Sequence, residues 1–193
     1  MYTFVLPLAS SGGMGDGAEV LSWGDFRRAR PDLADAGRGL LYQFGVGLGF
    51  LATVRKDGGP RVHPICPVIV EDRLLAFIVP SPKADDLRRD SRYALHAFPP
   101  ERDEDAFYVT GTAVQTSDRV LRERAAAVFF EERQWSGPPP GFEEQKLFEF
   151  RVTSCLLTRT TGHGDHAPRH TVWRCDAAQL GRRPPVMKAT TEL

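Results

Sequence analysis

The sequence predicts a mainly β domain, an antiparallel barrel of six or seven strands with short helices on its outside. Residues 48–79 contain three runs rich in strand-forming side chains, separated by short polar turns at 57–59 and 71–73, which is typical of an antiparallel meander. Further strand-like and helix-like segments follow without an internal repeat or a linker. Closing these strands into a barrel removes the free edges that an open sheet would expose.

The composition is that of an ordinary globular protein with one core. The chain has 193 residues, of which 41% are apolar and 26% are charged, and a chain of this length buries enough surface to fold as one unit. We therefore expect one domain at 21–180, with flexible tails at 1–20 and 181–193. The 25 basic side chains balance 25 acidic ones, so no overall field favours nucleic acid or a membrane surface as a partner.

The cysteines and the first residues indicate a cytoplasmic protein. Cys66, Cys155 and Cys175 are widely spaced and form no CxxC pair, which argues against a zinc knuckle or a redox dithiol and favours a reducing compartment. The N-terminus lacks the basic start and the long apolar run of a signal peptide. No stretch approaches the roughly 18 apolar residues of a membrane span.

The first helices are predicted from a capping pattern and from apolar spacing. Ser22 can cap a helix, with Asp25 at the capping-box position. Pro31 marks either a break or a first helical turn. The apolar side chains available for the buried side of one or two short helices are Trp23, Phe26, Leu33, Leu40 and Leu41.

The meander is predicted as strands at 48–55, 61–70 and 74–79. Pro64 and Pro67 lie inside the second of these strands, and proline cannot donate to a sheet ladder. These positions therefore belong either to an edge or bulge, or to a place where a ligand or a partner subunit replaces the neighbouring strand.

In the second half of the chain, predicted helices and strands alternate. A short helix is expected at 84–90, and Ser117 is placed to cap a later one. The apolar residues on one face of that later helix are Leu121, Ala125, Val128 and Phe129. The remaining strands are expected at 93–98, 106–116, 146–157 and about 171–174.

Several patterns are too weak to define an active site. The glycine run at 45–49 leads into a strand, whereas the dinucleotide fingerprint opens a helix. Four residues are metal ligands by type, namely His163, His166, His170 and Cys175. Their spacing matches no zinc pattern, and we expect solvated histidines in a hairpin connection and no metal. The sequence also contains no GxSxG elbow or Cys/His nucleophile arrangement, so we assign no catalytic side chain.

One short segment has the chemistry of an anion site. Ser81 and Lys83 lie where a strand ends and a helix begins. A helix N-terminus presents free N–H groups and the positive end of the dipole, so a phosphate there would gain a hydrogen bond from Ser81 and a charge pair from Lys83. Arg88 and Arg89 raise the local potential. The residues alone are equally compatible with a capped helix whose cations are solvated.

The run of residues 49–98 resembles the FMN-binding split β-barrel family, the pyridoxamine 5′-phosphate oxidase-like proteins. The resembling pieces are LATVRKDGGPRVHP at 51–64, SPKADDLRRD at 81–90, and YALHAF with the strand that contains Gly111. The resemblance covers about residues 21–176. It implies a six-stranded split barrel and a homodimer, with one FMN in each of two grooves between the subunits.

The candidate cofactor-binding residues are Arg61, Val62, His63, Pro64, Val79, Pro80, Ser81, Lys83 and Arg88. The resemblance implies all of them except Arg88, which is included for its charge. The first four match the strand that lines the isoalloxazine ring and the ribityl chain, and the next two match the strand end beside the ring. Ser81 and Lys83 match the Ser-x-Lys that holds the phosphate, and Arg88 adds a cation near it.

The resemblance implies a reaction type but no particular substrate. Trp173 and Arg174 stand in a setting unlike the substrate-binding arginines of the vitamin-pathway oxidase, so pyridoxamine 5′-phosphate is not implied. We expect an FMN-dependent oxidoreductase acting on an unidentified small molecule, with the flavin carrying the redox chemistry. Two alternatives stay open: a deazaflavin-dependent reductase, whose acidic tail needs cations such as those of Arg61, Arg88 and Arg89, and a non-catalytic module that binds flavin or haem.

Overall fold

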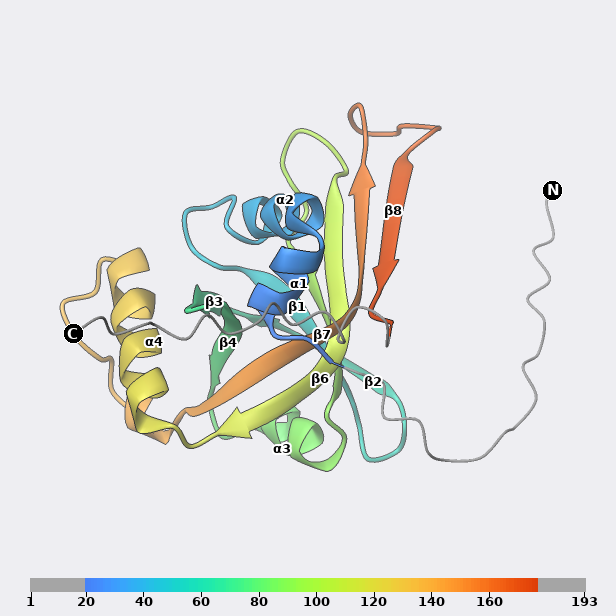
Figure 1. Cartoon of the computed structure of the whole chain (residues 1–193). Coiled ribbons are helices and arrows are strands. Elements are labelled where there is room, and N and C mark those ends of the chain that lie inside the picture. The colour runs from blue at the N-terminus through green and yellow to red at the C-terminus, as the bar shows by residue number, and fades with distance from the viewer. Residues whose placement is uncertain (1–19, 177–193) are drawn as a thin grey trace, which may run out of the picture.

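The computed structural model describes residues 20–176, and it shows one curled antiparallel sheet with helices around it (Figure 1). The predicted tail at 181–193 and residues 1–19 of the other tail lie outside the described residues. In chain order the elements are α1 (Trp23–Ala29), α2 (Pro31–Leu41), β1 (Gly49–Val54), β2 (Pro60–Ile65), β3 (Pro67–Val70), β4 (Arg73–Ile78), α3 (Pro82–Arg89), β5 (Arg92–Ala97), β6 (Ala106–Thr116), α4 (Arg119–Glu132), the 3-10 turn η1 (Phe142–Glu144), β7 (Lys146–Arg159) and β8 (Arg169–Arg174).

The strand order is an open path, and its two ends leave a split in the curled sheet. Neighbouring strands follow the order β2-β1-β5-β6-β7-β4-β3, and β8 pairs with the second half of β7. Because Cys66 alone separates β2 from β3, the chain itself joins the two ends of this order. Among the described strands β2 pairs only with β1, so its other edge is free and borders the split.

The predicted mainly β barrel with outlying helices is confirmed, and it contains more strands than expected. The strand predicted at 61–70 is divided at Cys66 into β2 and β3. Pro67 is the first residue of β3, a strand position that tolerates a missing N–H. β8 is the strand predicted at about 171–174, and with the divided strand it brings the described sheet to eight strands, against the six that the resemblance implies. None of the described helices is long and apolar enough to cross a membrane.

Local capping sets two helix starts. The Asp25 N–H donates to the Ser22 hydroxyl at 3.1 Å, and that hydroxyl donates to the Asp25 carboxylate at 2.7 Å, so the predicted cap of α1 is confirmed. The predicted cap at Ser117 is wrong by one residue. Asp118 caps α4 instead, because its carboxylate accepts from the Leu121 N–H at 3.0 Å.

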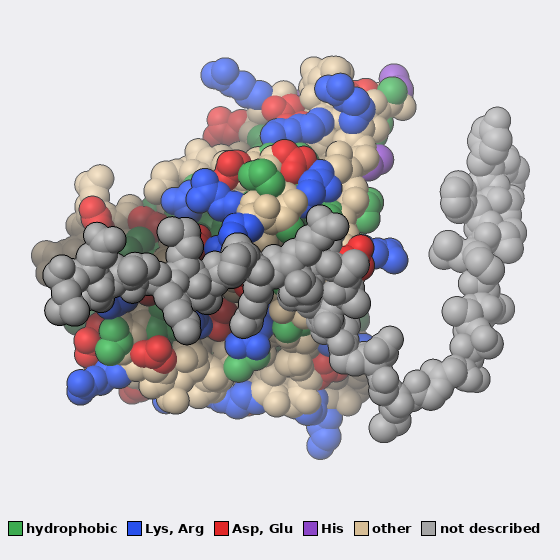
Figure 2. Space-filling model, in the orientation of Figure 1, with side chains coloured by type: hydrophobic (Ala, Val, Ile, Leu, Met, Phe, Trp, Pro, Cys, Tyr) green, Lys and Arg blue, Asp and Glu red, His purple; other side chains and the backbone are tan. Residues whose placement is uncertain are grey.

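Two apolar clusters hold the helices against the sheet. The larger fills the barrel and extends to α1 and α2, where the ring of Trp23 packs edge-on against Phe26 and Phe107. The smaller lies between α4 and the outer faces of β3 and β4, and it includes Leu121 and Phe129 as predicted. Over the face seen in Figure 2, acidic and basic side chains intermingle.

Candidate functional site

The corner between β4 and α3 lies across the split from β2. Val79 and Pro80 are exposed in the turn after β4, and Ser81 is the N-cap residue of α3. The Ser81 hydroxyl donates to the Val79 carbonyl at 2.8 Å rather than to the helix. Lys83 Nζ lies 3.5 Å from the carbonyl oxygen of Pro64 in β2. The structure therefore brings Ser81, Lys83 and the predicted part of β2 to one place.

Lys83 supplies the free positive charge of this corner. Its side chain is half-buried, and burial lowers the pKa of the ammonium below its ordinary value, an effect that a thiolate at the nearby Cys66 opposes. Among the described residues no carboxylate lies within ion-pair distance of Lys83, since all described ion pairs belong to other cations. A half-buried cation without a counter-ion gains from an anion placed beside it.

Arg61 is held by a carboxylate that sequence reasoning did not single out. Its Nε donates to Oδ2 of Asp86 in α3 at 2.7 Å, and the Asp86 side chain is only 4% exposed. Thr53 in β1 donates to the same oxygen at 3.1 Å, and Arg89 donates to Oδ1 at 3.1 Å. Burial raises the pKa of Asp86, but the hydrogen bonds from Arg61, Arg89 and Thr53 outweigh it and leave the pKa below its usual value. Asp86 is therefore a charged link between α3 and the strands β1 and β2.

Arg88 makes contacts on another side of α3. Its guanidinium donates to Asp85 at 2.8 Å and to Gln115 of β6 at 2.9 Å. The described contacts thus connect this arginine to β6, and none of them connects it to Lys83 or to β2.

The predicted residues of β2 are divided between two faces of the sheet. Arg61 and His63 pair with buried residues of β1 and share the interior face, whereas Val62 and Pro64 share the outer face. Val62 is 58% exposed. A ligand lying along the free edge of β2 would therefore meet side chains from both faces.

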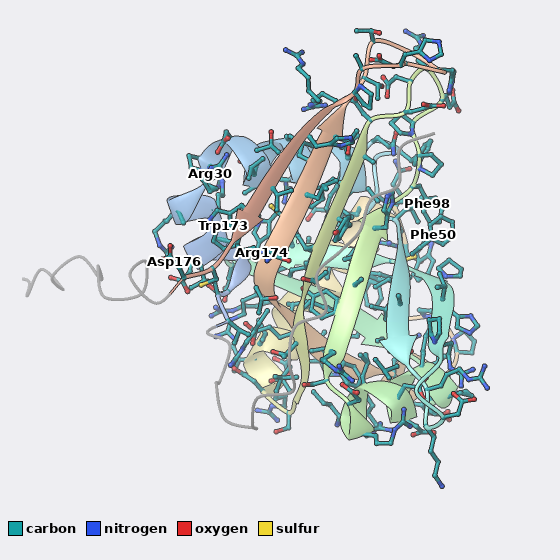
Figure 3. The ribbon with its side chains drawn as sticks, turned by 90° about the vertical axis from the view of Figure 1, so that its right-hand side faces the viewer. Arg30, Phe50, Phe98, Trp173, Arg174 and Asp176 are labelled. Carbon is teal, nitrogen blue, oxygen red and sulfur yellow. The ribbon has the colours of Figure 1, made fainter. Side chains whose placement is uncertain are left out.

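A row of large side chains crosses the outer face and ends at the split. In register from β2 to β8 it consists of Pro64, Phe50, His96, Tyr108, Leu156 and Val172. We call this row the outer ridge. Phe50 stacks on Phe98 with ring centroids 4.3 Å apart (Figure 3). Phe50 and Val172 are 38% and 57% exposed, and such an exposed apolar band on a sheet is typical of a protein interface.

A shallow hollow lies on the same face of the sheet as the outer ridge. It has a volume of about 290 Å³, and its lining includes Ala52, Val54, Pro60 and Ala94. The rest of the lining comes from Thr53, Gly58, Arg92 and Tyr93. The sheet therefore presents a raised band and a shallow depression side by side.

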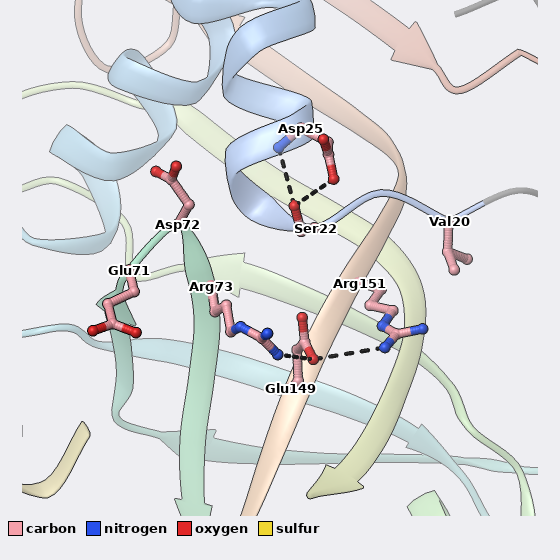
Figure 4. Close-up of a pocket in the computed structure, with 8 residues that line it drawn as sticks. All are labelled: Val20, Ser22, Asp25, Glu71, Asp72, Arg73, Glu149 and Arg151. Atoms are coloured by element: carbon pink, nitrogen blue, oxygen red, sulfur yellow. Dashed lines mark hydrogen bonds and ion pairs between the residues drawn. The ribbon is translucent and has the colours of Figure 1, made fainter. Parts of the chain in front are cut away.

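A larger hollow of about 500 Å³ contains none of the predicted site residues (Figure 4). Its lining is Val20, Ser22, Asp25, Glu71, Asp72, Arg73, Glu149 and Arg151. Glu149 accepts from Arg73 at 3.0 Å and lies 3.8 Å from Arg151. Each acidic and basic group of this hollow lies in an ion pair with another of them or with a nearby arginine.

The histidine-rich segment makes local contacts. In the part of the chain that the structure describes, no three His, Cys, Asp or Glu side chains are placed to hold a metal ion. His163 Nε2 lies 3.1 Å from the carbonyl oxygen of Glu101, and His170 Nδ1 lies 2.9 Å from the Thr158 hydroxyl. The first contact joins the β7–β8 hairpin to the loop between β5 and β6, and the second joins β8 to β7 within the hairpin.

Comparison with known proteins gives matches in structure rather than in sequence. No protein-family model matches the chain, and no curated protein matches it. A candidate pyridoxamine 5′-phosphate oxidase from Listeria innocua is similar with a TM-score of 0.52 at 16% identity, over 64% of this chain and 95% of that one. A candidate 5-nitroimidazole antibiotic resistance protein from Bacteroides thetaiotaomicron has a TM-score of 0.52 at 15% identity, over 63% and 80%.

A haem-binding protein from Mycobacterium smegmatis is also similar, with a TM-score of 0.53 at 14% identity, over 72% of this chain. The match spans 57% of that protein's length. At these identities the likeness establishes a common fold and no common activity.

Proposed function

We propose that this chain, whose fold is the split barrel of the pyridoxamine 5′-phosphate oxidase-like proteins, binds FMN and acts as an FMN-dependent oxidoreductase on a small molecule. The observation that carries the proposal is Lys83, a half-buried ammonium without a carboxylate partner among the described residues, placed across the split from β2. A phosphate monoester carries about 1.5 to 2 negative charges at pH 7 and matches this cation. When bound, the flavin supplies the redox chemistry, and the protein supplies binding and orientation.

The proposal gives each predicted residue a task. Lys83 and Ser81 hold the phosphate. To do so, the Ser81 hydroxyl gives up its hydrogen bond to the Val79 carbonyl and donates to the phosphate instead. Arg61 offers the two Nη groups that its bond to Asp86 leaves unused. Arg88, bonded to Asp85 and Gln115, contributes charge at longer range. The residues proposed to line the ring and the ribityl chain are Val62, His63, Pro64, Val79 and Pro80.

The pairing of the arginines supports FMN over a deazaflavin with a long acidic tail. Arg61 and Arg89 share the carboxylate of Asp86, and Arg88 is paired with Asp85. Lys83 is then the one cation of this corner without a carboxylate partner among the described residues. The ammonium of Lys83 and the unused Nη groups of Arg61 suit one phosphate, whereas an extended acidic tail needs further free cations, and Arg88 and Arg89 each bond a carboxylate.

Titration of the purified protein with FMN and with riboflavin tests the function. A charge-assisted contact contributes about 1.5–3 kcal/mol, so we expect FMN to bind at least about tenfold more tightly than riboflavin. Mass spectrometry of whatever small molecule copurifies provides an independent check. Binding of a deazaflavin without FMN would support the alternative reductase, and bound FMN that no nicotinamide or chemical donor reduces would support a storage or sensing role. A protein that binds no flavin would contradict the proposal.

We also propose a homodimer formed through the outer ridge. The ridge ends at Pro64, whose carbonyl is next to Lys83, so a second copy on this face would extend over the split. The raised band and the neighbouring hollow let two copies related by a two-fold axis fit into one another. The groove between the copies would then shield the flavin from water.

Phe50→Glu is expected to convert the dimer to a monomer. Placing a carboxylate at the centre of an apolar interface costs on the order of 2–4 kcal/mol, which raises the dimer dissociation constant by more than about 20-fold. Sedimentation equilibrium measures this constant. Val120→Glu is the matched control, because Val120 is an exposed apolar residue of α4 outside the ridge. A wild-type chain that stays monomeric, or a control that dissociates equally, would contradict the proposed interface.

A further inference from the structure

We infer that Asp86 is a positioning residue of the proposed flavin site, which holds Arg61 oriented so that the unused part of its guanidinium can meet the phosphate. The inference rests on the proposed function. It adds a residue that the sequence placed in an ordinary charged helix, next to a near-identical neighbour, Asp85.

Asp86 uses both of its oxygens inside the protein. Oδ2 accepts from Arg61 Nε and from the Thr53 hydroxyl, and Oδ1 accepts from Arg89. The carboxylate is 4% exposed, whereas the Arg61 side chain is 28% exposed. Both oxygens of Asp86 are therefore hydrogen-bonded and buried, whereas the side chain of Arg61, which Asp86 holds, is partly exposed to solvent.

The bond to Asp86 leaves donors of Arg61 unused. Only Nε of Arg61 donates to a described acceptor, and the two Nη groups have no described hydrogen-bond partner. A guanidinium held through Nε keeps a pair of donors for a phosphate, which an arginine binds with two parallel hydrogen bonds.

Two bridges connect α3 to β2, and they are one helical turn apart. Lys83 reaches the Pro64 carbonyl, and Asp86, three residues further along the helix, reaches Arg61, three residues earlier in the strand. Residues three apart share a face of a helix, so Lys83 and Asp86 both lie on the side of α3 that meets β2. Arg61 is thereby kept at the border of the same gap that Lys83 spans.

Because Asp86 orients Arg61 before the ligand arrives, Arg61 binds the phosphate more tightly. A long side chain that is already ordered loses less conformational freedom when a ligand arrives. The carboxylate does not cancel the attraction for an anion, because one negative charge is shared by Arg61 and Arg89. Without Asp86, Arg61 would have to be ordered by the phosphate itself.

The test compares the affinities of FMN and riboflavin, because their ratio isolates the contribution of the phosphate. In Asp86→Asn we expect this ratio to fall about tenfold, with the affinity for riboflavin nearly unchanged. Loss of a buried ionic partner also lowers stability. Arg61→Lys therefore tests the same point with the buried carboxylate in place, because an ammonium engaged by Asp86 has no planar pair of donors left. We expect the same fall in the ratio.

Asp85→Asn is the matched control. It removes the same charge from the same helix, but the Asp85 side chain is 72% exposed and pairs with Arg88, so we expect the ratio to stay unchanged. If Asp85→Asn and Asp86→Asn both bound FMN more tightly by the same factor, the positioning role would be overturned. An unchanged ratio of FMN to riboflavin affinity in Arg61→Lys would overturn it as well. Equal losses of FMN and riboflavin affinity in Asp86→Asn would mean that Asp86 only supports the fold. A wild-type protein that binds FMN no better than riboflavin would instead overturn the proposed function.

Discussion

Replacing Lys83 with alanine is expected to weaken FMN binding by about 1.5–3 kcal/mol, the usual loss for a hydrogen bond to a charged group. This corresponds to a rise in the dissociation constant of roughly 10- to 150-fold. The loss is large because Lys83 has no described carboxylate partner that already compensates its charge. Quenching of flavin fluorescence during titration measures the constant. The affinity for riboflavin, which lacks the phosphate, is expected to change little.

Lys56→Ala is the control for this variant. Lys56 is an exposed lysine in the turn between β1 and β2, so its removal changes the net charge equally without touching the corner. An unchanged FMN affinity in Lys83→Ala would remove the phosphate assignment on which the proposed function depends. A parallel loss of riboflavin affinity would show that Lys83 acts on the fold, through its contact with β2.

Gly111→Ala is expected to lower the free energy of unfolding by about 3–5 kcal/mol, at the upper end of single-residue effects. The pairing of β6 with β7 shifts register between Thr110 and Gly111. A Cβ added at Gly111 would lie 1.8 Å from the carbonyl oxygen of Arg151. The added Cβ would be fixed to the backbone of β6, and the carbonyl belongs to the backbone of β7. Neither strand can move aside without breaking the hydrogen-bond ladder between them.

Urea denaturation measures this effect, with Gly137→Ala as the control. A Cβ at Gly137 meets no heavy atom within 4 Å, so we expect a change within about 0.5 kcal/mol. Equal stabilities of the two variants would contradict the close approach of the strands at the bulge. The close approach of β7 is also a physical reason for glycine at position 111 of β6, one of the strands that resemble the split-barrel family.

Much of the fold was predictable because it depends on residues close together in the chain. The turns at 57–59 and 71–73, the cap at Ser22 and the long strand that becomes β6 each follow from a local pattern. The junction of strand and helix at Ser81 and Lys83 is local as well. For this reason an anion site at this junction was predicted from the sequence alone, and the titrations with FMN and riboflavin test it.

The remaining parts depended on contacts between distant segments. Arg61 and Asp86 are 25 residues apart, and within the sequence Asp86 is indistinguishable from the solvated Asp85 beside it. The direction of Arg88 toward Gln115 was likewise invisible, since it depends on how α3 lies against β6. The division of the second strand at Cys66 follows from the pairing of β3 with β4.

The sequence by itself determined most of the elements, their order along the chain, and the serine and lysine that follow β4. Only the tertiary structure decided which of the charged side chains near this corner are already paired and which edge of β2 stays free. It also decided that six strands align large side chains into the outer ridge, which ends at Pro64. The physical reason is that propensity and capping act over a few residues, whereas strand register and the partner of a buried charge are set when the whole sheet closes.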